Sequence, residues 1–423
     1  MRDQDFRRTF NTIFSTFPFY RRKIDVDITR VRTVDDLRKL PFVTREDITE
    51  YSENYTEYLP RFRGCYIEST SGTTGPPKRV LWSYKEFEEE TRKIYNFWKL
   101  HGLAQKGNRL AISLGVPGIG HQIVLHSLIL SKADTLPLPL IPSPRLLADH
   151  VRELVQFRPT GIVTAPTLMI KYSETATSHN ISLENIRLRK VVVTGEPLTK
   201  STRKRIAELW GIDETRICDG YCTTEASTVG YELPGLSGIY VSKRDYVIET
   251  FDASTGHPIE REGELVITKA NRYSFPHLRY KIGDVGKILG EDTVRGERYY
   301  VLDEIRGRVH DSIRIHTCTI YGADIEDLLF TIDHEITNYQ VHFFEEGGRK
   351  KILVRIESSS KQKDTLAREL EQGIATINED FEALVGSGVV ARPEVMYVAT
   401  GTIRKRLVKE WILHEPPQGL ANR

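Results

Sequence analysis

The chain has little of what secreted and membrane-spanning proteins depend on. It contains four cysteines in 423 residues, and only Cys218 and Cys222 lie close together, which is too sparse for a disulfide framework. No run approaches the roughly 18 apolar residues of a membrane-spanning helix. The first residues also lack the apolar core and the small-residue cleavage site of a signal peptide. These absences predict a cytoplasmic protein without a membrane partner.

An excess of one charge sign is absent as well. The chain has 60 Lys and Arg residues against 58 Asp and Glu residues, a formal net charge of +2 at pH 7. Such a chain has no broad basic surface for nucleic acid, so nucleic acid is not expected as a partner. Hydrophobic residues at 39% and charged residues at 28%, without a low-complexity tract, predict an ordinary globular protein.

Length and pattern together predict two domains, because the chain exceeds the roughly 100 to 200 residues of one ordinary domain. Between residues 66 and 304, short Val- and Ile-rich runs alternate with helical patterns. This alternation predicts an α/β domain with mainly parallel sheets flanked by helices. Beyond the segment 307–311 the pattern becomes a mixture of strands and helices. We therefore expect a large N-terminal domain at 1–306 and a small α+β domain at 307–423.

The clearest local signal is the segment STSGTTGPPK at residues 69–78. Glycines let a backbone approach an anion closely, hydroxyl and N–H groups donate hydrogen bonds to it, and Lys78 adds positive charge. The segment is not a Walker loop, since the G-x-x-x-x-G-K-[ST] spacing is missing. A phosphate-binding loop is the favoured interpretation, and a flexible surface loop is the alternative.

This segment resembles the phosphate-binding signature of the adenylate-forming superfamily, which includes acyl- and aryl-CoA synthetases, peptide-synthetase adenylation domains and luciferases. Further matches follow in the order of the family: GEPLT at 195–199, YCTTE at 221–225, YKIGD at 280–284 and RGRVHDSIRI from Arg306. The residues before the loop resemble the phenylacetate-CoA ligase branch. The resemblance implies an ATP- and acid-binding large domain and a mobile C-terminal lid that turns about a hinge at 307–311.

The resemblance also implies roles for single residues. Tyr221 would stack on adenine, Thr224 would contact the AMP phosphate, and Glu225 would ligate Mg²⁺, a hard cation that prefers oxygen ligands. The implied catalytic residues are Lys78, Thr224, Glu225 and Lys405. The implied ATP and AMP ligands are Ser71, Gly72, Thr73, Thr74, Gly75, Gly195, Glu196, Tyr221, Asp284 and Arg308. Taken singly, such residues are also common as helix caps, turn residues and surface charges.

The acid should bind between the segment GVPGIGHQ at 115–122 and the strands that end near Thr194 and Tyr221. The candidate residues of this acid pocket are Gly120, His121, Thr194 and Cys222. His121 could contact the acid or act as a local cap. Cys222 and Thr194 stand where the family commonly has glycine, so they should narrow the pocket. A packing role for Cys222 is favoured over a reactive one, because a thiolate beside phosphates is disfavoured.

The C-terminal domain departs from the family pattern. If Gly401 is matched to the family glycine, Thr402 occupies the position of the lysine that normally reaches the acyl carboxylate, and Lys405 and Lys409 follow it. Losing such a charge can lower the rate on the order of a hundredfold. His310 stands in the hinge. No Cys and His cluster follows YCTTE, so structural zinc is not expected.

These patterns predict an ATP-dependent ligase that converts a carboxylic acid, aryl or arylacetic by resemblance, to acyl-AMP and pyrophosphate. ATP and Mg²⁺ are the expected cofactors, CoA is the first candidate acceptor, and a homodimer would suit this branch. An amine or a carrier-protein thiol remains open as the acceptor. A catalytically weak nucleotide-binding regulator is a further alternative, against which the retained charges of Lys78, Glu225, Asp284 and Arg308 argue.

Overall fold

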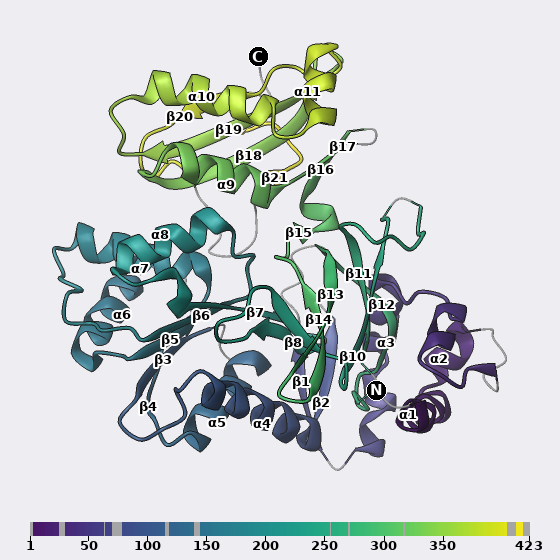
Figure 1. Ribbon diagram of the computed structural model, residues 1–423. Coiled ribbons are helices and arrows are strands. Elements are labelled where there is room, and N and C mark those ends of the chain that lie inside the picture. The colour runs from purple at the N-terminus through teal and green to yellow at the C-terminus, as the bar shows by residue number, and fades with distance from the viewer. Residues whose placement is uncertain are drawn as a thin grey trace.

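The computed structural model describes residues 3–24, 30–62, 64–69, 78–114, 118–138, 144–253, 255–269, 271–315, 318–403 and 412–417. A large part contains two main sheets, and a smaller part built from the last hundred residues lies above it in Figure 1. Within these described ranges, no helix combines the length and the apolar character that a membrane crossing requires.

The centre of the large part is a nine-stranded sheet with the order β13-β14-β9-β8-β7-β6-β5-β3-β4. Its parallel strands are β3 (Arg109–Ser113), β4 (Asp134–Pro137), β5 (Gly161–Thr164), β6 (Lys190–Thr194) and β7 (Ile217–Thr223). Its antiparallel strands are β8 (Ser227–Glu232), β9 (Ile239–Ser242), β13 (Ile288–Val294) and β14 (Glu297–Leu302). The short Val-rich runs are strands buried on both faces, as parallel strands between helices usually are.

Helices cover both faces of the parallel strands. Because successive strand residues point to opposite faces, Val191 and Val193 pack on one side of the sheet and Val192 on the other. The first side carries α6 (Pro144–Phe157), α7 (Pro166–Ser178) and α8 (Lys200–Trp210), and the second carries α4 (Tyr84–Leu100) and α5 (Ile119–Leu130). Figure 1 shows α4 and α5 below the sheet and α6 to α8 above it.

A second, antiparallel sheet lies beside the first. Its strands are β10 (Tyr246–Phe251), β11 (Gly263–Lys269), β12 (His277–Gly286) and β15 (Gly307–Arg308). The hairpin of β1 (Cys65–Ser69) and β2 (Arg79–Ser83) stands between the sheets, and the N-terminal helices are α1 (Asp3–Thr16), α2 (Pro18–Lys23) and α3 (Arg45–Glu53). Of these helices, α2 is tied to the segment before β12, since the Tyr20 hydroxyl donates to the Pro276 carbonyl at 2.5 Å. Short 3₁₀ segments lie at Asp35–Lys39, Tyr55–Glu57, Leu59–Arg61, Glu214–Arg216 and Val309–Asp311.

The smaller part has its own α+β core. Its elements are β16 (Ser312–Ile315), β17 (Cys318–Tyr321), α9 (Gly322–Ile332), β18 (Ile336–Glu346), β19 (Arg349–Ser358), α10 (Lys363–Ala375), α11 (Glu379–Gly386), β20 (Glu394–Tyr397) and β21 (Ile412–Leu413). In the described part of the chain, strands β16 to β21 pair only with one another. The expected fold class is therefore confirmed, with the addition that antiparallel strands extend the parallel sheet.

The smaller part docks on α8 through buried polar contacts. The Thr202 hydroxyl donates to the Glu326 carboxylate at 2.7 Å, and the backbone N–H of Ser201 donates to Asp327 at 2.8 Å. Arg205 also lies against the ring of Phe330, 4.6 Å from its centre. These contacts place the start of α9 at the edge of the cavity described next.

Candidate active site

A cavity of about 820 Å³ opens at the carboxyl ends of β6 and β7. Lys78, the turn after β7, residues of β12 and β15, and the first residues of α9 all line it. Clefts at this edge of a parallel sheet are the usual ligand sites of α/β proteins. The tertiary structure thus brings segments separated by more than a hundred residues to one place.

Lys78 and Glu225 form a buried ion pair in this cavity. The Lys78 ammonium also donates to the Tyr280 hydroxyl at 3.2 Å. Burial raises the pKa of the Glu225 carboxyl, but the attraction of Lys78 outweighs burial and brings the pKa down to about 2. Glu225 is therefore ionised at neutral pH and can bind a cation, while Lys78 can bind a phosphate.

Asp284 lies at the centre of a second group. The Tyr221 hydroxyl donates to its carboxylate at 2.7 Å, and Arg308 Nε donates to the other oxygen at 3.3 Å. This meeting follows from strand register, because Asp284 on β12 is paired with Arg308 on β15. Burial and the neighbouring Asp284 raise the pKa of Tyr221 well above its ordinary value, so its hydroxyl keeps its proton. The group offers acceptors for sugar hydroxyls beside a cation for phosphate.

The remaining predicted nucleotide residues fall into three groups. Thr224, Gly195 and Glu196 line the cavity. The Glu196 carboxylate, however, accepts hydrogen bonds from the Thr167 N–H at 3.0 Å and from its hydroxyl, at the first turn of α7. This residue therefore has a helix-capping role in the structure. The predicted residues Ser71, Gly72, Thr73, Thr74, Gly75 and Lys405 lie outside the described residues.

The other end of the cavity is apolar. Ile94, Phe97 and Trp98 come from α4, and Ile123 comes from α5. His121 also lines it, and its Nδ1 has no hydrogen-bond partner in the described part of the chain. Because burial lowers the pKa of this imidazole, His121 is neutral at pH 7. His121 thus offers a neutral polar group beside an apolar wall of the cavity.

The remaining residues predicted for the acid pocket line the same cavity. Gly120 precedes His121 in the first turn of α5 and lines the same cavity. The Thr194 hydroxyl donates to the Gly220 carbonyl at 2.6 Å, so it is held against β7. Cys222 Sγ lies 3.7 Å from the Thr228 hydroxyl, and burial raises the pKa of its thiol. Both features agree with a packing role for Cys222.

Sequence reasoning missed several residues that line the cavity or contact its lysine. Tyr280 stands in the quoted YKIGD segment, but nothing local showed that it would contact Lys78. Arg45 lines the cavity from the start of α3, more than thirty residues before Lys78, and carries no motif. Asp219 lines it too, and burial, with the charge of Glu232, raises the pKa of its carboxyl to about 8. A strand residue of this kind reveals its environment only once the fold is known.

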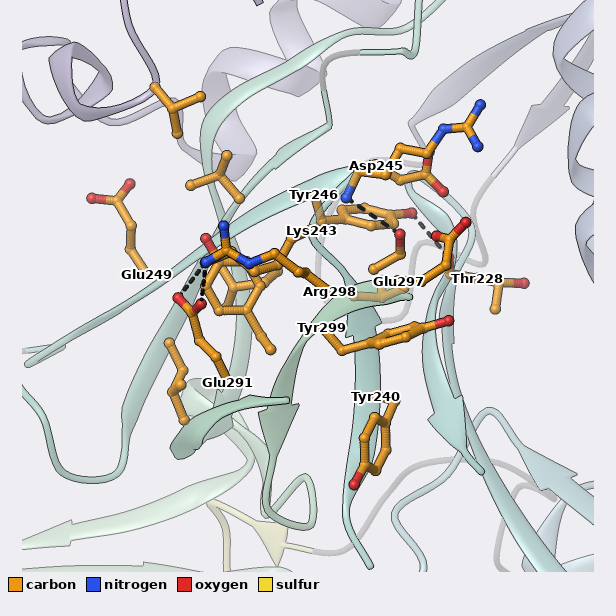
Figure 2. Close-up of a pocket in the computed structure, with 18 of the residues that line it drawn as sticks. Thr228, Tyr240, Lys243, Asp245, Tyr246, Glu249, Glu291, Glu297, Arg298 and Tyr299 are labelled. Atoms are coloured by element: carbon orange, nitrogen blue, oxygen red, sulfur yellow. Dashed lines mark hydrogen bonds and ion pairs between the residues drawn. The ribbon is translucent and has the colours of Figure 1, made fainter. Parts of the chain in front are cut away.

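A second hollow, a trough of about 2740 Å³, lies on the outer surface of β8, β9, β10 and β14. Figure 2 shows its aromatic and charged side chains, among them Tyr240 and Tyr299. Three of its charges are paired with one another, since Lys243 and Arg298 both contact Glu291. None of the predicted site residues that the structure describes lines this trough, so the cavity at Lys78 is the candidate active site.

Comparison with known proteins shows the family of the chain. A family model described as AMP-binding enzyme matches residues 23–274, which is more than half of the chain. The chain therefore belongs to the AMP-binding enzyme family. It is an AMP-forming ligase of the adenylate-forming superfamily, and the expected resemblance to the phenylacetate-CoA ligase branch is confirmed by the relatives.

Two relatives and two solved structures of one ligase are similar to this chain. The chain is 26% identical over 374 residues to the phenylacetate-coenzyme A ligase of Thermus thermophilus, covering 85% of this chain and 81% of the relative. It is 24% identical over 358 residues to the indoleacetate–lysine synthetase of Pseudomonas savastanoi, covering 83% and 84%.

One of the solved structures is a 2-hydroxyisobutyryl-CoA ligase in the postadenylation state with R3-HIB-AMP. It is 18% identical with a TM-score of 0.82, over 98% of this chain and 88% of that chain. The same ligase in its thioesterification state gives a TM-score of 0.66 at 19% identity, over 98% and 88%.

Proposed function

We propose that this enzyme uses MgATP to activate an aryl or arylacetic acid as acyl-AMP and then transfers the acyl group to CoA. The observation that carries the proposal is the meeting of Lys78, Glu225, Asp284 and Arg308 around one cavity whose far end is apolar. Charged side chains at one end suit a nucleotide triphosphate, and the apolar end suits the body of an acid.

Mg²⁺ fits this set of residues. In the described part of the chain, no three His, Cys, Asp or Glu side chains gather to hold a metal ion alone. Mg²⁺ is commonly held by one or two carboxylates together with substrate phosphates and water. The ionised Glu225 supplies such a carboxylate beside the phosphate-binding Lys78. When bound, the ion stabilises the negative charge on the phosphates and on the pyrophosphate leaving group.

The protein's own residues then divide the work of adenylation. Asp284 accepts hydrogen bonds from the ribose hydroxyls, and the Tyr221 ring covers the adenine. An oxygen of the acid's carboxylate attacks the α-phosphorus, and the bond from that phosphorus to the bridging oxygen breaks to release pyrophosphate. Lys78 and Arg308 oppose the charge that develops on the phosphate oxygens, a contribution worth about 3 kcal/mol per well-placed donor.

The C-terminal part serves as the lid in this proposal. Its hinge is the segment 307–311, which begins with β15, the edge strand of the second sheet. Docking of α9 on α8, through Glu326 and Asp327, holds the lid over the cavity. The higher TM-score against the postadenylation state than against the thioesterification state supports an adenylation-type arrangement of the two parts. Transfer to CoA would follow after the lid turns.

The position directly after Gly401, whose φ is +85°, holds the exposed Thr402, which carries no charge. Lys405 is therefore our candidate for the missing C-terminal lysine. Lys409 provides the matched control within the same basic segment. Lys405→Met should lower the rate of acyl-AMP formation about a hundredfold, and Lys409→Met should leave it within threefold. Equal effects of the two changes would remove the assignment of Lys405.

The central test measures pyrophosphate release with MgATP and a panel of aryl, arylacetic and fatty acids. Release should require one acid class and should be lost in Glu225→Ala and on removal of Mg²⁺ with EDTA. Glu249→Gln is the matched control, because Glu249 is likewise a largely covered glutamate paired with a basic side chain, that of Arg279, but lies outside the cavity. If the wild type releases no pyrophosphate with any acid, the proposed activity is wrong.

The acceptor is tested in the same assay. CoA should raise turnover and yield an acyl thioester, which mass spectrometry detects. The relationship to indoleacetate–lysine synthetase supports a second candidate, an amine acceptor. Consumption of acyl-AMP by lysine but not by CoA would favour that candidate, and consumption only by a phosphopantetheinylated protein would favour a carrier thiol.

A further inference from the structure

The turn that carries Glu225 has an unfavourable backbone. It connects β7 to β8, and Ser227 at its end has a φ of +66°, in the left-handed region that residues with a side chain rarely adopt. Such a conformation persists when surrounding groups hold it in place, and it concentrates at functional sites. The turn at Glu225 should therefore be held by groups that contact its backbone.

Two buried cations hold its backbone carbonyls. Arg272 Nε donates to the Glu225 carbonyl at 3.4 Å, and the Lys269 ammonium donates to the next carbonyl, that of Ala226, at 2.7 Å. Both side chains are 1% exposed. Successive carbonyls of the turn are therefore fixed by positive charges from β11 and the segment that follows it.

The Tyr246 hydroxyl adds a third contact to this turn. It lies 2.7 Å from the Ala226 carbonyl and 3.0 Å from the Thr228 carbonyl, on either side of Ser227. Figure 2 shows Tyr246 reaching toward Thr228 at the wall of the trough. The carbonyls before and after the strained Ser227 therefore both contact the hydroxyl of Tyr246.

Both cations are anchored on one face of α4. Arg272 contacts Glu86 at 3.1 Å, and Lys269 contacts Glu90 at 2.9 Å. The two glutamates are four residues apart, so they lie one above the other on the helix. Glu90 also keeps a second cation, Lys93, at 3.0 Å. Glu90 is therefore held between two cations.

Arg272 also reaches the segment that carries Lys78. Its Nη2 donates to the Leu81 carbonyl at 2.7 Å, on strand β2, which begins directly after Lys78. One guanidinium thus binds the backbone of two segments, the turn that carries Glu225 and the strand β2 beside Lys78. Because the guanidinium is planar and rigid, it sets the distance between these two segments. The contact with the Trp82 ring, 3.4 Å from its centre, limits how the fork can turn.

Stability alone does not account for these charges. Burial lowers the pKa of Lys269 to about 8 in spite of Glu90, which shows how strongly the interior opposes the charge. Buried ion pairs can often be replaced by apolar side chains without loss of stability. These buried charges are better explained by the turn that they hold in place, which carries Glu225.

We propose that Lys269 and Arg272 are positioning residues, which fix the turn that carries Glu225 relative to the segment that carries Lys78. In this way they keep Glu225, the candidate Mg²⁺ ligand, facing the phosphate-binding Lys78. The proposal rests on the function proposed above. It predicts that these residues control how strongly Mg²⁺ improves the binding of ATP, although neither touches the cavity.

Lys269→Met is the best variant, because Glu90 keeps Lys93 as a partner and the fold should survive. Arg279→Met is the matched control, since Arg279 is also buried, contacts Glu249 at 3.1 Å and donates to a backbone carbonyl, that of Arg38, at 3.1 Å. Isothermal titration calorimetry measures ATP affinity with Mg²⁺ and with EDTA. Kinetics with the preferred acid separate kcat from KM.

We expect Lys269→Met to reduce the gain in ATP affinity from Mg²⁺ at least fivefold, with affinity in EDTA within twofold of wild type. Its kcat should fall at least tenfold, with the KM for the acid within threefold. Arg272→Met should behave similarly, and Arg272→Lys should recover part of the loss. The Arg279→Met control should keep both the Mg²⁺ effect and kcat.

If Lys269→Met and Arg272→Met change the Mg²⁺ effect no more than Arg279→Met does, the proposal is overturned. Should the charge variants fail to fold, Tyr246→Phe removes only a hydroxyl from the same turn and should still lower kcat about threefold; an unchanged kcat would overturn the proposal as well. Calorimetry measures ATP binding and does not depend on the reaction. If the wild type releases no pyrophosphate, the proposed activity is therefore rejected, while the positioning role is still decided by the calorimetry.

Discussion

The Lys78–Glu225 pair allows a quantitative prediction about stability. Lowering the pKa of Glu225 from its ordinary value of 4.5 to about 2 corresponds to about 3 kcal/mol of favourable interaction in the folded state. Lys78→Met removes the largest favourable part of that interaction, to which a backbone hydrogen bond and Arg308 also contribute, and leaves a buried carboxylate without its ammonium partner. The free energy of unfolding should therefore fall by about 3 kcal/mol, within the range for breaking a buried pair.

A double-mutant cycle separates this interaction from general disruption. Glu225→Gln alone should destabilise the protein by about 2 kcal/mol, and the double variant Lys78→Met/Glu225→Gln should be much more stable than the sum of the two losses implies. We expect a coupling energy of about 3 kcal/mol from urea unfolding at pH 7. A coupling below about 0.5 kcal/mol would show that the two side chains do not interact in solution.

The pH dependence gives an independent check. The folded-state pKa of Glu225 lies below the unfolded value, so its contribution to stability is fully present above pH 4.5 and is lost as the pH falls toward about 2. The difference in unfolding free energy between the wild type and Glu225→Gln should therefore stay constant from neutral pH down to pH 4.5 and shrink below it. A difference that grows on acidification would contradict the sign of the pKa shift.

Other parts of the structure give further predictions. Asp284→Ala should raise the KM for ATP at least tenfold while leaving the KM for the acid unchanged, since a hydrogen bond to a charged group contributes about 1.5 to 3 kcal/mol; an equal rise in both would reject a ribose role. Glu326→Ala combined with Asp327→Ala should loosen the lid, seen as faster proteolysis within 307–311 and a larger radius of gyration in solution scattering, whereas unchanged values would mean that these contacts do not hold it. Because burial raises the pKa of its thiol, Cys222 should react with iodoacetamide at pH 8 at least tenfold more slowly in the native enzyme than in urea. Peptide mass spectrometry measures both rates, and similar rates would place the thiol at the surface.

Much of the site could be predicted because its residues stand in short, ordered segments. Lys78, Tyr221, Glu225, Asp284 and Arg308 each belong to such a segment, and all five line one cavity. Glu196 belongs to one as well, yet its carboxylate caps α7 through Thr167. A motif specifies where the backbone runs more reliably than what each side chain contacts.

Residues outside the motifs could not be predicted in this way. Arg45, Lys269 and Arg272 reach the site or its supporting turn only through the packing of distant segments. In the sequence they stand among ordinary charged and aromatic residues. Their interactions depend on distances that the chain acquires after folding.

The sequence by itself determined the class of fold and the chemistry, because strand and helix periodicity and a phosphate-binding segment are local properties of the chain. Only the tertiary structure decided that the parallel sheet continues into antiparallel strands, that Asp284 meets Arg308 across two strands, and that one arginine joins the Lys78 and Glu225 segments. The physical reason is that burial, strand register and the pairing of buried charges arise between segments far apart in sequence, where no local pattern records them.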